Sequence, residues 1–165
     1  HKAGLRVNMD VVYNHVSNAN TFSQNLIVPG YFFRRDDNGN LTSGSGCGND
    51  VASERPMVRK FIVDSVKYWA TEYNLDGFRF DLMGLMDIET INEITAALKK
   101  IDPTILVIGE GWNMGTLPAD KRANQLNISN CQVLRTLMTK FEMVLRDLFL
   151  MQQIMVLQLE NSLQR

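Results

Sequence analysis

The stretch GFRFDL at residues 77–82 decides the fold class, because it is a short, apolar run that favours a β-strand and ends on a carboxylate. Two similar runs lie before and after it, LRVNMDVV at residues 5–12 and ILVIGE at residues 105–110. Runs of this length with few charges are typical of buried parallel strands. We therefore expect three strands in this part of the chain.

Helical spacing of apolar residues separates these strands. One helix is expected from a cap at Ser53 to Tyr73, and a second from about Ile88 to Lys100. The order strand, loop, helix, strand, helix, strand requires parallel strands joined by right-handed crossovers. The pattern thus predicts an α/β fold, and three strands fit an open sheet as well as a barrel.

A long polar segment at about 14–52 follows the first strand. It contains turn residues such as Pro29-Gly30 and a Gly-Ser-Gly-Cys-Gly run at residues 44–48. No Lys-Ser/Thr follows that run, so it is interpreted as a flexible turn and not as a phosphate loop. Loops of this length in compact domains are usually functional or disordered.

The bulk composition excludes several classes of partner. The formal net charge is −1 with acids and bases interspersed, so neither nucleic acid nor an anionic membrane is expected to bind. No apolar run is long enough to cross a bilayer. Cys47 and Cys131 form neither a disulfide framework nor a metal-binding spacing. No leader is visible, and because the chain begins with His1, the compartment stays unknown.

Two carboxylates end successive predicted strands, Asp81 and Glu110. The carboxyl ends of parallel strands meet at one edge of a sheet, so both side chains are expected at one site. Neighbouring strands lie ~4.8 Å apart, which allows two carboxyl groups about 5 Å apart, as in a retaining glycosidase. A wider gap with room for water would instead indicate an inverting enzyme.

Other polar residues are expected at the same edge. Arg79 precedes Asp81 by two positions and so points to the same side, where its charge would stabilise a negative Asp81 and suit a nucleophile. His15 follows the first strand, and Trp112 offers an apolar face to a sugar ring. Taken singly, a strand-end carboxylate is more often a cap or an ion pair, and such a His is more often structural. Only the combination favours a site.

Three of these segments resemble the signature regions of the α-amylase superfamily of glycoside hydrolases: DVVYNH at residues 10–15, GFRFD at 77–81 and IGE at 108–110. Four longer strings narrow the resemblance to the type I pullulanases, which debranch α-1,6 linkages: VPGY at 28–31, GSGCGN at 44–49, DLMGLMD at 81–87 and GEGW at 109–112. The resemblance extends from His1 to about Asn130.

This resemblance implies a partial (β/α)8 barrel, with residues 1–130 holding about the third to fifth strands and their helices. It implies retaining double displacement on the α-glucans pullulan, starch and glycogen, with Asp81 as nucleophile and Glu110 as acid and then base. The substrate-binding residues that it implies are His15, Arg79, Trp112, Asn14, Asn49 and Asp50. No cofactor and no protein partner are implied, although some relatives bind calcium near the position of Asn14.

The chain also departs from the family. A fourth signature region with a His-Asp pair is missing, since no histidine occurs after His15. A chain with only part of a barrel is expected to be poorly folded and inactive alone, because strand edges and apolar surface stay uncovered. A non-catalytic remnant that at most binds α-glucan is therefore an alternative. So is another activity of the superfamily, α-1,4 cleavage or branching, which the pullulanase-like strings disfavour.

Residues 131–165 do not resemble the family and contain neither Gly nor Pro. Regrouping their codons by one nucleotide, with suitable synonymous choices, produces a continuation that resembles pullulanases. We therefore interpret the tail as translated out of frame. The alternative is an ordinary amphipathic helix from Leu134 to Leu159.

Overall fold

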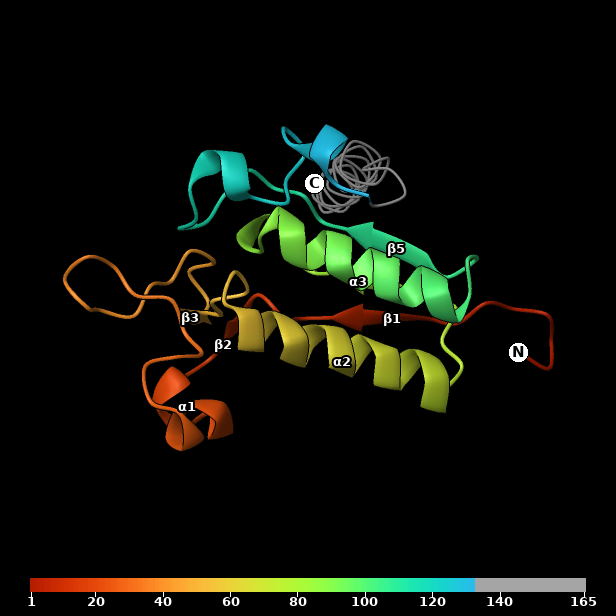
Figure 1. The fold of residues 1–165 in the computed structure, drawn as a ribbon, viewed down its shortest axis with the longest axis horizontal. Coiled ribbons are helices and arrows are strands. Elements are labelled where there is room, and N and C mark those ends of the chain that lie inside the picture. Colours follow the sequence, from red (N-terminus) through yellow and green to blue (C-terminus); the bar gives the residue numbers. More distant parts are fainter. Residues whose placement is uncertain (133–165) are drawn as a thin grey trace, which may run out of the picture.

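A computed structural model of the chain describes residues 1–132 (Figure 1). The strands are β1 (Asn8–Val11), β2 (His15–Val16), β3 (Asn49–Asp50), β4 (Gly77–Phe80) and β5 (Leu106–Gly109), and the α-helices are α1 (Ser23–Ile27), α2 (Pro56–Glu72) and α3 (Ile88–Ile101). The three strands and two helices predicted from periodicity are present, and each of these strands is shorter than the apolar run that predicted it. The predictions for the tail beyond residue 132 lie outside the described residues.

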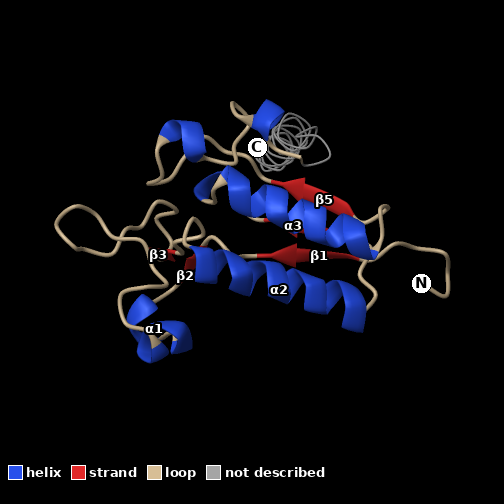
Figure 2. Ribbon diagram, in the orientation of Figure 1, coloured by secondary structure: helices blue, strands red, loops and turns tan. Residues whose placement is uncertain are grey.

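The central sheet of the described residues is parallel, in the order β1–β4–β5. Its register aligns Asp10 with Arg79 and Arg79 with Ile108. Helices α2 and α3 lie side by side across one face of this sheet, as Figures 1 and 2 show. The strands and helices therefore form a two-layer α/β unit, as the order of elements predicted.

Alternation along the strands separates an apolar face from a polar one. Val11, Phe78, Phe80 and Val107 are each at most 6% exposed and pack in one core with the helices. The residues between them point to the opposite face, where Arg79 is hydrogen-bonded to a strand neighbour. Arg79, one of the predicted site residues, thus lies on the face that α2 and α3 leave open.

Helix α2 owes its position to an apolar stripe. Val58, Ile62, Val66 and Ala70 recur every four residues and are at most 5% exposed. Pro56 occupies the first helical turn, where its missing N–H leaves no helical hydrogen bond unmade. This stripe packs the helix against the sheet and against α3.

The predicted cap of this helix was wrong. Arg55 precedes the first turn and makes no side-chain capping bond. Ser53 is fully buried and exchanges two hydrogen bonds with Asp87, donating from Oγ to Oδ2 at 2.7 Å and accepting from the backbone N at 3.1 Å. Asp87 is itself the N-cap of α3, where its side chain accepts from the backbone N of Thr90. Ser53, which the sequence suggested as a helix cap, therefore joins the segment before α2 to the start of α3.

The long segment after β1 is more ordered than a loop. It contains the antiparallel pair of β2 and β3, helix α1 and the short 3-10 helix η1 (Ala19–Thr21). Phe32 and Phe33 are at most 8% exposed and stack edge-on at 5.4 Å between ring centroids. Figure 1 shows this segment gathered at the end of the sheet towards which β1 and β5 point, so it borders the carboxyl ends of the strands.

Candidate active site

The two predicted catalytic carboxylates follow neighbouring strands. Asp81 comes directly after β4, and its backbone N donates to the carbonyl of Val11 at 3.0 Å. Glu110 comes directly after β5, and its backbone N donates to the carbonyl of Phe80 at 2.9 Å. Both residues continue the ladder of the parallel sheet by one step, which brings their side chains to the same edge.

A single guanidinium joins these carboxylates. Nη1 of Arg79 lies 3.1 Å from Oδ1 of Asp81, and its Nη2 lies 3.3 Å from Oε2 of Glu110. The same Nη1 donates to both carboxylate oxygens of Asp10 at 3.0 Å. The Arg79, Asp81 and Glu110 side chains are between 17% and 27% exposed, so the cluster is open to a ligand while its charges are partly screened from water.

The backbone after Asp81 also contributes to the site. Leu82 adopts a left-handed conformation with φ 39° and ψ 48°, which is unusual for a residue with a branched side chain. This turn aims the Leu82 N–H at Glu110, with 3.3 Å between N and Oε2. Backbone strain next to a cluster of functional groups is common at active sites. No sequence signal predicted this donor.

Asn14 and His15 reach the site from the segment that follows β1. Asn14 is fully buried, and its Nδ2 donates to the carbonyl of Asp81. Its Oδ1 contacts Nδ1 of the half-buried His15. Asn14 therefore supports the backbone at Asp81 and holds the His15 ring, instead of facing solvent itself.

Trp112 is half-buried in the turn after Glu110. Its carbonyl lies so close to Gly84 that an added Cβ there would approach it to 1.9 Å, so no larger residue fits at position 84. The Gly84 N also donates to the Glu110 carbonyl at 3.4 Å. The turn with Trp112 is thus packed directly onto the segment that follows Asp81.

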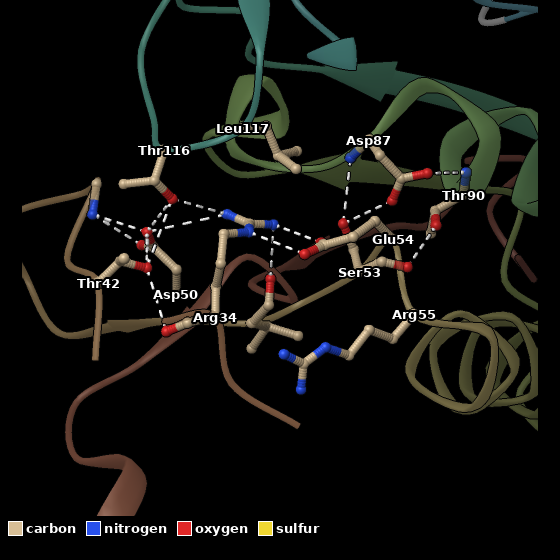
Figure 3. Close-up of polar contacts among 12 residues, drawn as sticks. Arg34, Thr42, Asp50, Ser53, Glu54, Arg55, Asp87, Thr90, Thr116 and Leu117 are labelled. Carbon is tan, nitrogen blue, oxygen red and sulfur yellow. Dashed lines mark hydrogen bonds and ion pairs between the residues drawn. The ribbon is translucent and has the colours of Figure 1, made fainter. Parts of the chain in front are cut away.

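Asn49 and Asp50 lie opposite Val16 and His15 in the β2–β3 pair, and their side chains are bonded to other parts of the protein. The side chain of Asn49 accepts from the backbone N of Ala19 at 2.9 Å. Asp50 is fully buried and is occupied by protein donors, including the hydroxyls of Thr42 and Thr116, each at 2.8 Å (Figure 3). The structure therefore brings Asp81, Glu110, Arg79, Asn14 and His15 together and gives Asn49 and Asp50 contacts within the protein.

Two charged residues of this region were not predicted as functional. Asp10 lies inside β1, and only the register places it beside Arg79. Arg34 is 6% exposed and contacts Asp50 and Glu54, although its position after two phenylalanines carried no signal of a partner. Among residues 1–132, no three His, Cys, Asp or Glu side chains converge as metal ligands, and no helix is long and apolar enough to cross a membrane.

Comparison with known proteins finds pullulanases that match about three quarters or more of the chain. No protein-family model matches it. The pullulanase of Bacillus subtilis (strain 168) is 51% identical over 128 residues, which are 77% of this chain and 18% of that protein. The chloroplastic pullulanase 1 of Arabidopsis thaliana is 39% identical over 140 residues, covering 76% of this chain and 14% of that protein. The crystal structure of a mutant pullulanase from Paenibacillus barengoltzii complexed with maltotriose superposes with a TM-score of 0.79 at 53% identity, covering 80% of this chain and 21% of that chain.

A parallel α/β unit with paired carboxylates at adjacent strand ends belongs to a class of architecture that glycoside hydrolases use. Within that class, the relatives confirm the resemblance seen in the signature segments: the chain is homologous to a part of the type I pullulanases. It spans about a fifth of the length of the Bacillus subtilis and Paenibacillus barengoltzii relatives.

Proposed function

We propose that this chain carries the nucleophile and the acid/base of a pullulanase-type debranching enzyme that cleaves α-1,6-glucosidic bonds in α-glucans with retention. The sheet β1–β4–β5 would be about the third to fifth strands of a (β/α)8 barrel, and residues 1–130 its partial catalytic domain. The observation that carries the proposal is the Arg79 guanidinium, which contacts both Asp81 and Glu110 at adjacent strand ends.

In the proposed reaction, Glu110 donates a proton to the glycosidic oxygen while Asp81 attacks the anomeric carbon, which forms a covalent glycosyl ester. Glu110 then accepts a proton from water, and this water displaces Asp81 from the sugar. Arg79 would stabilise the negative charge of Asp81 before attack and after release. The maltotriose bound in the Paenibacillus barengoltzii relative supports an α-glucan as the substrate class.

The ring contacts of the sugar are assigned to two residues. His15, held by Asn14, would donate to a sugar hydroxyl, and Trp112 would stack on a sugar ring. These assignments come from the resemblance and from the position of both residues beside the carboxylates. Asn14 would then act through His15 and the Asp81 backbone, without touching the substrate.

A segment exchange tests the catalytic roles in a complete enzyme. Residues 1–130 replace the homologous segment of the Bacillus subtilis pullulanase, and the release of maltotriose from pullulan is measured. The exchange should preserve activity, whereas Asp81→Asn and Glu110→Gln should each lower kcat by about 10³-fold, within the range known for such groups. The matched control is Glu93→Gln, an exposed carboxamide substitution on α3, which should leave kcat unchanged.

Retention is tested separately in the same hybrid enzyme. Proton NMR of the first product should show the α-anomer, because two displacements restore the starting configuration. A β-anomer would exclude Asp81 as a nucleophile. Activity of the Asp81→Asn or Glu110→Gln hybrid close to that of the parent would exclude the corresponding assignment.

The 165-residue chain alone has a second candidate function, glucan binding without turnover. The absence of a histidine after His15 within these 165 residues, and the 18% of the Bacillus subtilis relative that they span, favour it. We expect no release of reducing sugar from pullulan by the isolated chain. Weak binding of maltotriose, followed by Trp112 fluorescence in a Trp69→Phe chain, would support the binding role, and turnover by the isolated chain would contradict it.

A further inference from the structure

We propose that Arg34, Asp50 and Thr116 form a positioning cluster that fixes the His15 side of the candidate site relative to its Trp112 side. The cluster joins two segments that are far apart in sequence, the loop that ends in β3 and the turn that follows Glu110 (Figure 3). This proposal rests on the proposed function, because it assigns a role at the same sugar site. Arg34 and Thr116 are not placed in contact with the substrate, and Asp50, which the resemblance implies as a substrate-binding residue, is fully buried against protein donors.

Asp50 is the centre of the cluster. Its Oδ2 accepts from Thr42 Oγ1 and Thr116 Oγ1 at 2.8 Å each, and its Oδ1 accepts from the backbone N of Gly44 at 2.8 Å. Nη1 of Arg34 lies 3.9 Å from Oδ2. A fully buried carboxylate is costly unless it is paired and hydrogen-bonded, so these contacts strongly favour one arrangement of the loops.

Arg34 anchors the same arrangement to the start of α2. Its Nε and Nη2 donate to the two carboxylate oxygens of Glu54 at 3.2 Å and 2.8 Å, a bidentate pair. Nη2 also donates to the carbonyl of Val51 at 3.1 Å, and Nη1 donates to Thr116 Oγ1 at 3.1 Å. The guanidinium therefore joins the segment at residues 51–54 to the turn that contains Thr116.

Thr116 is the link to the other side of the site. It belongs to the turn with Trp112, and its hydroxyl both donates to Asp50 and accepts from Arg34. The two loops approach each other so closely that a Cβ on Gly44 would lie 2.9 Å from the Cα of Gly115. The contact is therefore direct, with no room for a side chain between the backbones.

Asp50 is connected to the candidate site through its backbone. In the antiparallel β2–β3 pair, Asp50 lies opposite His15. The N of Val51 donates to the carbonyl of Asn14 at 2.9 Å, and the Asn14 side chain donates to the carbonyl of Asp81. A shift of Thr116 relative to Asp50 would therefore change the separation between His15 and Trp112.

The experiment uses the full 165-residue chain with Trp69→Phe throughout, which leaves Trp112 as the only tryptophan. Thr116→Val removes the bridging hydroxyl at constant shape. The matched control is Thr71→Val, which removes an exposed hydroxyl that bonds only within α2. Acrylamide quenching of Trp112, maltotriose affinity and the unfolding midpoint are measured for each variant.

If the cluster positions the two sides of the site, Thr116→Val should raise the native-state quenching constant of Trp112. It should also weaken maltotriose binding about fivefold, the effect of one lost hydrogen bond. Thr71→Val should change neither. If the Thr116 hydroxyl only stabilised the fold, Thr116→Val would lower the unfolding midpoint but leave native-state quenching and affinity at the parent values. That result would overturn the proposal. If the Asp50→Asn chain folds, its quenching constant should rise more, and its affinity fall further, than those of Thr116→Val. If the Asp50→Asn chain does not fold, the Thr116→Val result alone decides the proposal.

The two proposals fail in different ways. If the parent does not respond to maltotriose, glucan binding by this chain fails, and the quenching difference between Thr116→Val and Thr71→Val still decides the positioning proposal. If the parent binds maltotriose and Thr116→Val matches it in affinity and quenching, the positioning proposal fails alone.

Discussion

At the scale of single residues, Arg79 determines the electrostatics of the candidate site. It contacts Asp10, Asp81 and Glu110. The carboxylates of Asp10 and Asp81 both lie within 3.1 Å of its Nη1. Three carboxylates around one cation repel each other once the cation is lost. The arginine therefore compensates the negative charge of these carboxylates, and an uncharged residue of similar size would leave that charge uncompensated.

We expect Arg79→Met to lower the free energy of unfolding by about 1–3 kcal/mol at low salt, because charged hydrogen bonds are lost. The loss should shrink at high salt, which screens the carboxylates. Urea unfolding at low and high salt measures both effects. The control is Arg35→Met, whose guanidinium donates to an exposed loop carbonyl and should matter little. An Arg79→Met chain as stable as the parent at low salt would contradict the prediction.

At the scale of elements, buried polar contacts tie the start of α3 to the segment before α2. Ser53 is fully buried and Asp87 is 4% exposed, and their two hydrogen bonds close the gap between the segments (Figure 3). Arg59 on α2 adds an ion pair to Oδ1 of Asp87 at 3.1 Å. The N-cap of α3 is therefore held by α2 and by the residues just before it.

Ser53→Ala should lower the free energy of unfolding by about 1–3 kcal/mol, since it leaves a buried carboxylate oxygen and a backbone N–H without their partner. Chemical denaturation followed by circular dichroism measures the change. Ser43→Ala, at an exposed loop position, is the matched control and should stay within about 0.5 kcal/mol of the parent. Equal stabilities of the two variants would show that the Ser53 contact adds nothing.

At the scale of the whole molecule, residues 1–132 cover the central sheet with helices on one face only (Figure 1). The helices bury the apolar side of the sheet, while the side with Asp10 and Arg79 faces away from them. In the described residues, the outer edges of β1 and β5 have no further strand beside them. We expect poor folding at these edges and on this face, because nothing described covers them. The core under α2 and α3 is expected to persist in the isolated chain.

The two cysteines report on that core. Cys47 is exposed, and Cys131 is buried, where desolvation raises the pKa of its thiol. Because the thiolate is the reactive form, Cys131 should be alkylated much more slowly than Cys47 near pH 8. Its rate should continue to rise with pH beyond ~8.5, the pKa of an ordinary thiol. Mass spectrometry of timed iodoacetamide reactions on Cys47→Ser and Cys131→Ser chains measures each rate.

In denaturant both cysteines should react alike, which is the internal control. Equal rates without denaturant would contradict a persistent core. That outcome would instead support the poorly folded chain that the uncovered strand edges predict.

The sequence by itself determined the α/β class and the order of strands and helices along the chain, because apolar periodicity is a local property. It also predicted Asp81 and Glu110 at the ends of successive strands. The tertiary structure decided which residues meet across the fold. Ser53 contacts Asp87 instead of capping α2, and Asp50 is buried beside Arg34. Such partners depend on contacts between residues distant in sequence, and no local pattern encodes them.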